Sequence, residues 1–264
     1  MSLPLLWQYS FSNFNEKARW ALDFKRIPHR RRSLMPGGPR AMAFSRGEGT
    51  LPVLDLDGER IVDSTRIIEA LERRFPERPL YPVDPAERRQ ALELEDYFDE
   101  HAGHDMRRVG FWEFRDERAY GGSFLTTDQG RVKCLAVKAA MPVIFPVAWR
   151  YMNQRYDFSE EGSERSRVAL IAALDRIDSE RGGGDYLVGD GFTVADLAAA
   201  ALLFPLAWPP ELQHEFPEPP PSEFLDSLAD HPAVRWIRET YRRHRGESAE
   251  VTRSGARQRD RPAA

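Results

Sequence analysis

The sequence predicts a small α/β domain over residues 1–80, followed by an all-helical domain over residues 86–245. Two observations predict this division. Before about residue 76, short apolar runs typical of strands alternate with stretches of helical periodicity, whereas no convincing strand pattern follows later in the chain. The segment Pro76–Pro85 between the two regions is rich in proline, which is typical of a linker.

Length and composition exclude several classes of protein. The 264 residues suit one large domain or two modest ones. With 38 basic and 42 acidic side chains, the chain has a net charge of −4, which argues against a general nucleic-acid binder. The single cysteine, Cys134, excludes an intramolecular disulfide and a metal site made only of cysteines. We expect no metal.

The chain shows no export or membrane signal in its sequence. The segment Met1–Trp7 has no basic residue before its short apolar run, unlike a secretory signal. No uninterrupted apolar run approaches the roughly 18 residues of a membrane span. We therefore expect a cytoplasmic protein that contacts neither a membrane nor nucleic acid.

The first region has the expected order β-α-β-loop-β-β-α. Its strands are predicted over residues 3–9, 29–34, 51–56 and 59–62, and its first helix over 13–26. The dipeptide Asp57-Gly58 between the last two strands is typical of a tight hairpin turn. Asp63 and Ser64 are the residue types that cap a helix, and the apolar positions that follow them have helical spacing.

The second region is expected to be helical throughout. Its helices are predicted over about 86–113, 130–156, 163–181, 193–208 and 231–244. Thr193 and Asp196 have the spacing of a capping box, a pair of side chains that stabilises a helix start. Six prolines over 209–224 predict a loop, and the polar composition of 246–264 predicts a disordered tail.

Ser12 lies where the first strand meets the first helix. Taken alone, a serine in such a turn is usually a helix cap. A helix N-terminus is also the positive end of the helix dipole, so a hydroxyl there can donate a hydrogen bond to an anion. A thiol bound there would lose its proton more easily. Ser10 and Tyr9 are neighbouring hydroxyls that could take the same role.

The segment Ser12-Asn13-Phe14-Asn15 keeps the spacing of the Cys-Pro-Phe-Cys motif of glutaredoxin-like proteins but has neither cysteine. In this it resembles the thioredoxin-like N-terminal domain of cytosolic glutathione transferases, of the serine-type, bacterial-like kind. Without a sulfur at these positions, thiol–disulfide exchange has no nucleophile. The resemblance implies that Ser12 is catalytic and that Asn13 and Asn15 adjoin bound glutathione.

Two further motifs carry the resemblance. Taken alone, Pro52 after Leu51 indicates the start of an edge strand, and Asp63-Ser64 indicates a helix cap. The family has a cis proline at the first position, and the resemblance implies that the backbone of Leu51 pairs with the cysteinyl part of glutathione. It implies that Ser64 binds the γ-glutamyl carboxylate at a helix N-terminus, and that Asp63 contacts the α-amino group.

The second region resembles the family's helical domain, which contributes the pocket for the second substrate. On that basis Phe11, Phe111 and Trp112 are candidates for an apolar wall. Arg40 or Arg46, in the loop before Pro52, would hold the glycyl carboxylate of glutathione. A metal site at His101 and His104 is disfavoured, because the sequence offers no evident third ligand.

The resemblance implies a glutathione transferase fold, with glutathione as co-substrate and a small hydrophobic electrophile as second substrate. Ser12 would stabilise the glutathione thiolate, which attacks the electrophile, in a detoxification role. Family members are usually homodimers. Two alternatives stay open: a non-catalytic binding protein on this fold, and a glutathione-dependent dehalogenase, isomerase or ether-cleaving enzyme. A related thiol other than glutathione also stays open.

Overall fold

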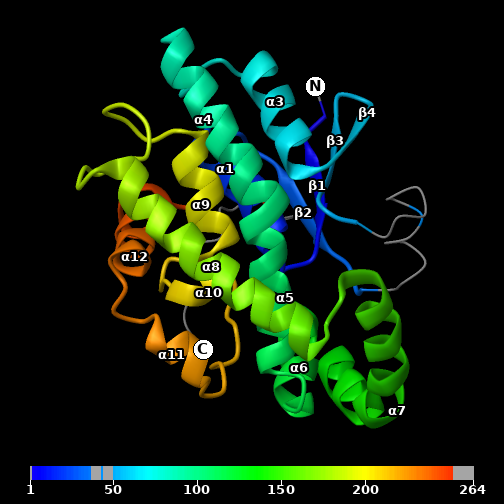
Figure 1. Ribbon diagram of the computed structural model, residues 1–264. Helices are drawn as coiled ribbons and strands as arrows, with labels where there is room; N and C mark the ends of the chain where they lie inside the picture. Colours follow the sequence, from blue (N-terminus) through cyan, green and yellow to red (C-terminus); the bar gives the residue numbers. More distant parts are fainter. Residues whose placement is uncertain (1, 37–42, 44–49, 252–264) are drawn as a thin grey trace.

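The computed structural model describes residues 2–36, 43 and 50–251. A small sheet with its helices lies beside a larger group of helices (Figure 1). The elements of the first region are β1 (Leu5–Gln8), α1 (Asn13–Phe24), β2 (Arg30–Ser33), β3 (Val53–Leu56), β4 (Glu59–Val62) and α3 (Ser64–Arg74). This is the expected thioredoxin-like order of strands and helices.

The sheet has four strands in the order β2-β1-β3-β4. Strand β1 runs parallel to β2, which α1 makes possible by crossing over between them, and antiparallel to β3. The predicted hairpin turn is confirmed: Asp57 and Gly58 both have positive φ, at 51° and 85°, the geometry of a tight two-residue turn. Leu6 and Leu54, which face each other across β1 and β3, are fully buried.

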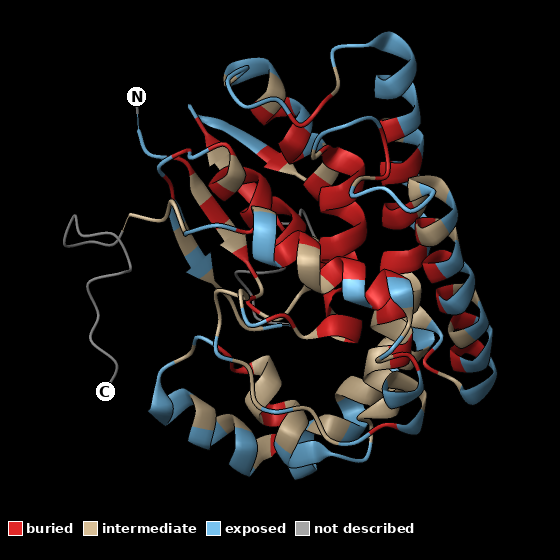
Figure 2. Cartoon of the chain, turned by 90° about the vertical axis from the view of Figure 1, so that its left-hand side faces the viewer, coloured by how far each residue is buried: buried red, intermediate tan, exposed pale blue. Residues whose placement is uncertain are grey.

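The second region is helical, as predicted. Its elements are α4 (Pro85–Tyr97), the π-helical turn η1 (Phe98–Ala102), α5 (Gly103–Glu113), α6 (Arg118–Leu125), α7 (Arg131–Tyr156), α8 (Glu160–Arg181), α9 (Val194–Leu202), α10 (Phe204–Ala207), α11 (Glu223–Ser227) and α12 (Pro232–His244). Helix α9 is buried over its whole length, and it packs against α1 and α4 (Figure 2). The two regions thus share one apolar core around α9.

Four details differ from the sequence prediction. Helices α6 and α11 lie in stretches for which no helix was predicted, and α11 begins inside the loop expected over 209–224. The stretch 193–208 is divided into α9 and α10, because Pro205 has no N–H to donate and its ring would collide with the preceding turn of a continuous helix. The π-helical turn η1 interrupts the single helix expected over 86–113.

The prediction of disorder from residue 246 is wrong for the first part of the tail. The backbone N–H of Val251 donates to the carbonyl of His29 at 2.8 Å, and His29 in turn donates to Ala249. The N–H of Ala249 donates to Asp23 Oδ1 at 2.8 Å. These bonds attach residues 249–251 to His29, just before β2, and to Asp23 in α1, while residues 252–264 lie outside the described residues.

No uninterrupted apolar run in α7 reaches the length of a membrane span, because Lys138 and Arg150 interrupt it, but the helix as a whole is long and apolar. By length and composition alone, its 26 residues could cross a membrane. Only 6% of its most apolar window is buried, so it is not a core helix of the soluble kind. Figure 1 shows α7 beside α6 at the edge of the molecule, away from the sheet.

Candidate active site

The structure joins the three motifs of the first region through hydrogen bonds. The N–H of Tyr9 donates to Asn15 Oδ1, and Asn15 Nδ2 donates to the carbonyl of Leu51, each at 3.2 Å. The N–H of Asp63 donates to the carbonyl of Pro52 at 3.3 Å. The start of α1, the proline before β3 and the start of α3 therefore form one continuous region.

Ser12 is the N-cap residue of α1, as predicted. Its backbone is extended, with φ −81° and ψ 131°, and its carbonyl accepts the first helical bond from Glu16 at 3.0 Å. Its side chain makes no capping hydrogen bond and is half-buried. The hydroxyl is thus available at the positive end of a helix, where an anion is stabilised.

The two alternative hydroxyls have other environments. Ser10 is buried, and its Oγ donates to the carbonyl of Thr127 at 2.5 Å. Burial, with a smaller contribution from the nearby Tyr156, raises the pKa of Tyr9 to about 12, which keeps its phenol neutral. Arg19 holds the backbone of this loop by donating to the carbonyl of Ser10 at 3.1 Å.

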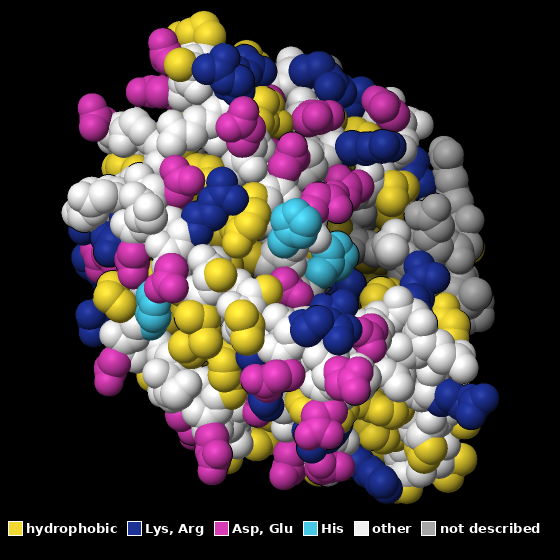
Figure 3. Space-filling model, viewed as in Figure 1, with side chains coloured by type: hydrophobic (Ala, Val, Ile, Leu, Met, Phe, Trp, Pro, Cys, Tyr) yellow, Lys and Arg dark blue, Asp and Glu magenta, His cyan; other side chains and the backbone are white. Residues whose placement is uncertain are grey.

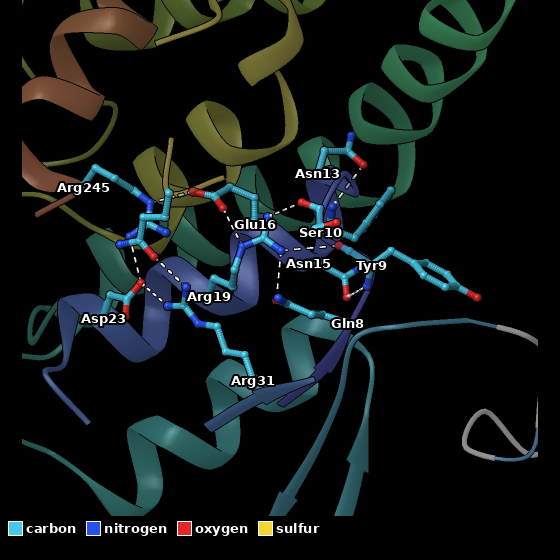
Figure 4. A network of polar contacts seen from close by, with 12 residues as sticks. Gln8, Tyr9, Ser10, Asn13, Asn15, Glu16, Arg19, Asp23, Arg31 and Arg245 are labelled. Carbon is cyan, nitrogen blue, oxygen red and sulfur yellow. Dashed lines mark hydrogen bonds and ion pairs between the residues drawn. The ribbon is translucent and has the colours of Figure 1, made fainter. Parts of the chain in front are cut away.

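Asn13 and Asn15 use their side-chain amides within the protein (Figure 4). Asn13 Nδ2 donates to the carbonyls of Gly103 at 3.2 Å and Leu202 at 2.9 Å, which ties the start of α1 to the helical region. Asn15 bonds both Tyr9 and Leu51. Both side chains therefore position the backbone around Ser12.

The peptide bond between Leu51 and Pro52 is cis, as the resemblance implied. Asp63 has φ +86°, which is uncommon for a residue with a side chain and is held here by two hydrogen bonds. Its Oδ1 accepts from the N–H groups of Thr65 at 3.0 Å and Arg66 at 3.2 Å. Ser64 beside it is buried, and α3 begins there as predicted.

A buried ionic cluster supports Ser64 from behind. Lys17 Nζ lies 2.9 Å from Glu95, 2.6 Å from Asp99 and 2.8 Å from Thr65 Oγ1. Burial alone would lower the pKa of Lys17, but the carboxylates of Glu95 and Asp99 raise it. The Ser64 hydroxyl donates to Asp99 Oδ1 at 3.5 Å, so α1, α3 and η1 converge on this cluster.

The described ring contacts of Phe11 are with Tyr9 and Phe124, whereas the sequence analysis grouped Phe11 with Phe111 and Trp112. The Phe11 ring lies 5.6 Å from the ring of Tyr9 and 5.4 Å from that of Phe124 on α6. Phe111 instead stacks on Phe158 at 5.1 Å. The sequence could not identify Phe124, because α6 itself was not predicted.

Trp112 likewise lies apart from Phe11. Its ring lies 4.0 Å from the guanidinium of Arg115, and it lines a surface hollow of about 1350 Å³ between the end of α5 and the start of α8. Adjacent residues on a helix point about 100° apart, and here the rings of Phe111 and Trp112 have different neighbours. Neither is placed beside Phe11 by a ring contact between described residues.

Helix α5 places the guanidinium of Arg107 near Phe14 of α1, and the sequence analysis did not predict this contact. Arg107 lies 4.3 Å from the ring of Tyr156 and 5.8 Å from that of Phe14, and its Nη2 is 2.7 Å from His104 Nδ1. Burial lowers the pKa of both Arg107 and His104. Gly103 allows α5 to pack closely against Phe14 of α1, because a Cβ at this position would lie 3.0 Å from the Phe14 ring. The spacing of His104 and Arg107 was the only sequence signal.

No metal site is found in the described part of the chain, where no three His, Cys, Asp or Glu side chains could share an ion. His101 and His104 have different neighbours, with His101 against Tyr97 and His104 against Phe14. Arg40 and Arg46, the candidates for the glycyl carboxylate, lie outside the described residues.

Family models match both regions of the chain. Residues 6–79 match the glutathione S-transferase N-terminal domain, and residues 160–237 match the C-terminal domain of the same family. Together the two matches span more than half of the 264 residues. The chain belongs to the glutathione S-transferase family.

Two curated relatives agree with this assignment. The chain is 25% identical over 216 residues to "Glutathione S-transferase TCHQD" of Arabidopsis thaliana, covering 75% of each chain. It is 30% identical over 97 residues to "Probable maleylacetoacetate isomerase 2" of Drosophila melanogaster, covering 34% of this chain and 43% of that one.

Solved structures confirm the fold. The β-etherase LigF from Sphingobium sp. strain SYK-6 matches with a TM-score of 0.61 at 19% identity, over 90% of this chain and 100% of that one. A glutathione S-transferase from Methylobacillus flagellatus with glutathione bound matches with a TM-score of 0.60 at 19% identity, over 90% and 93%.

Proposed function

We propose that this protein is a glutathione transferase in which Ser12 stabilises the thiolate of glutathione. The observation that carries the proposal is the Ser12 hydroxyl, which makes no capping bond although it stands at the N-terminus of α1. A hydrogen bond from this hydroxyl and the positive helix end would together favour the thiolate over the thiol. They would lower the thiol pKa from roughly 8.5 toward neutrality.

Glutathione would lie along the region that joins the three motifs. Its cysteinyl part would pair with the backbone of Leu51, next to the cis Pro52. Its γ-glutamyl carboxylate would bind Ser64 at the start of α3, and its α-amino group would contact Asp63. Structural neighbours crystallised with glutathione bound, from Methylobacillus flagellatus and Sulfitobacter, support the ligand.

In the chemical step, the thiol of glutathione first loses its proton to solvent water. The thiolate sulfur forms a bond to an electrophilic carbon, and that carbon either expels a leaving group with its electron pair or passes the pair to a conjugated acceptor. The electrophile would lie against Phe11 and Phe124, which supply an apolar surface beside Ser12. Catalysis then consists of positioning and of thiol activation. The homodimer and the cytoplasmic location stay predictions.

The first test is calorimetry with glutathione on the whole chain. We expect micromolar to low-millimolar binding by the wild type, weakened roughly tenfold to a hundredfold by Ser64→Ala, because the hydroxyl that would turn from Asp99 to the ligand carboxylate is lost. Ser227→Ala is the matched control, since Ser227 is exposed and bonds only the carbonyl of Phe224 among the described residues. Failure of the wild type to bind glutathione would falsify the proposal in favour of another thiol or a non-catalytic role.

A glutathione-dependent isomerase is the second candidate. The observation that favours it is the 30% identity over 97 residues with the Drosophila melanogaster protein named as a probable isomerase. Both reactions use the thiolate, but an isomerase returns glutathione unchanged whereas a transferase consumes it. Mass spectrometry of the products from a panel of electrophiles separates them, because an accumulating glutathione adduct supports the transferase.

A further inference from the structure

The segment that forms α7 has a one-sided charge. Residues 131–156 contain no Asp or Glu but five basic residues, whereas the whole chain has a net charge of −4. The basic residues are Arg131, Lys133, Lys138, Arg150 and Arg155. The first four form no ion pair with any described residue, and all five are exposed. Two of the four lysines of the chain lie on this one helix.

The outer face of α7 is apolar. Val132, Val143 and Val147 are 82%, 77% and 73% exposed. Positions 132, 136, 139, 143 and 147 follow one another at intervals of three or four residues, so they share one face of the helix, and each is Val or Ala. We call these five residues the α7 stripe. Leu135 and Tyr151 lie at its edges and are 68% and 61% exposed.

The face of α7 opposite the stripe contacts the rest of the protein. Met141 is buried, and a Cβ added to Gly122 of α6 would lie 3.2 Å from its side chain. The rings of Trp149 and Phe158 are tilted to each other, with centroids 5.6 Å apart. The helix is therefore attached by its inner face, and the stripe points away from the protein. In Figure 3, hydrophobic side chains with basic ones beside them gather at the lower right, over α6 and α7.

We propose that the α7 stripe docks on the surface of an anionic lipid bilayer. In a membrane interface, exposed aliphatic side chains such as those of the α7 stripe can enter the acyl region, and Lys and Arg side chains can meet lipid phosphates. The bilayer supplies both the apolar phase and the negative charge that α7 lacks. This inference is independent of the proposed catalytic function and reverses the sequence-based expectation of no membrane contact.

The helix lies on the membrane and does not span it. Between Lys138 and Arg150 only 11 residues, 139–149, are free of charge, whereas a span needs about 20. The α7 helix of a second copy fits the stripe less well. Two α7 helices packed face to face would bring ten cations together without an anion on either helix. An anionic surface neutralises those same charges.

The test is sedimentation of the whole chain with lipid vesicles. Vesicles of phosphatidylcholine mixed with an equal amount of phosphatidylglycerol should retain the wild type, and vesicles of phosphatidylcholine alone should retain much less. The variant with both Val143→Asp and Val147→Asp should bind the anionic vesicles at least roughly tenfold more weakly, because it loses apolar contact and adds negative charge. Replacing Lys133 and Lys138 by Gln should weaken binding and reduce its dependence on salt.

The matched control is Val168→Asp. Val168 is a valine on α8, outside the stripe, and it is 63% exposed. Its vesicle binding should equal that of the wild type. Circular dichroism melting of every variant shows that folding is unchanged. The proposal is overturned if anionic vesicles do not retain the wild type, or if the stripe variant binds as well as the control. It is also overturned if light scattering shows a dimer that only the stripe variant disrupts, because the stripe then binds a second copy.

Discussion

The N-cap of α1 and the ionic network along that helix contrast in how their polar groups are used, and Figure 4 shows the network. At the N-cap, the hydroxyl of Ser12 makes no capping bond and is half-buried. Along the turns of α1, Glu16 lies 2.8 Å from Arg19 and 2.6 Å from Arg245, and Asp23 lies 2.6 Å from Arg31. We call the Ser12 N-cap the open end, because its hydroxyl keeps its bonding capacity, and we call the ion-paired network of Glu16 and Asp23 the closed end.

The difference separates a binding function from a structural one. Ionised groups taken out of water are tolerated only with partners, and Glu16 and Arg245 are fully buried. Burial alone would raise the pKa of Glu16, but Arg245 and Arg19 hold it below its ordinary value. A hydroxyl that keeps its bonding capacity is compatible with a ligand, whereas this closed network fixes the loop before Ser12 through Arg19.

The largest expected effect comes from breaking the closed end. Arg245→Ala leaves the carboxylates of Glu16 and Asp23 buried with a missing partner, so we expect the free energy of unfolding to fall by about 3–5 kcal/mol. Urea unfolding measures the change. Arg242→Ala is the control, since Arg242 is an exposed partner of Glu239 on the same helix and should change stability by less than about 1 kcal/mol. Equal effects of the two substitutions would contradict the role given to the network.

The next effect is a loss of stability in mild acid. His29 accepts a hydrogen bond from Arg31 at Nε2, which leaves Nδ1 to donate to the carbonyl of Ile27, so the ring is neutral. Burial, and next the charge of Arg31, lower the pKa of His29 from 6.5 to about 4. Between these values the unfolded chain binds a proton that the folded chain does not, so stability is complete above pH 6.5 and falls toward pH 4.

His29 alone should contribute about 3 kcal/mol to that fall. Burial also lowers the pKa of His214, to about 2, and this adds a loss of the same sign. The contribution of His29 is therefore measured as a difference, by comparing urea unfolding of the wild type and His29→Gln at several pH values. If both proteins lose the same stability between pH 6.5 and 4, His29 is not the titrating group.

At the open end, we expect Ser12→Ala to lower activity while leaving stability nearly unchanged. Turnover of glutathione with an electrophile should fall roughly a hundredfold, or about 2.7 kcal/mol of activation free energy, because the thiolate loses its hydrogen bond. The pH at which turnover rises should move upward, since the thiol pKa returns toward its free value. Ser10→Ala is the control, because Ser10 bonds Thr127 and should affect stability by about 1 kcal/mol instead. If Ser10→Ala abolishes turnover and Ser12→Ala does not, the roles are reversed.

Local sequence patterns were sufficient to predict the position of Ser12, but they were not sufficient to predict the ion pairs of Glu16 and Asp23. Ser12 and Ser64 could be placed because helix starts have short signatures, and both lie where those signatures predicted. The partner of Glu16 is 229 positions away, at Arg245, and no local pattern connects them. The same limit applies to Arg107, whose approach to Phe14 depends on how α5 packs against α1.

The smallest effect comes from a helix start that resembles Ser12 in position but not in bonding. Thr193 is the N-cap of α9, its Oγ1 accepts from the N–H of Ala195, and it donates to Asp196 at 2.9 Å. Thr193→Ala should therefore cost about 1 kcal/mol of stability and leave glutathione turnover unchanged, the reverse of Ser12→Ala. Thermal melting and a steady-state assay on both variants complete the comparison. A loss of turnover in Thr193→Ala at temperatures where it is fully folded would mean that bonding at a helix start does not distinguish a cap from a catalytic hydroxyl.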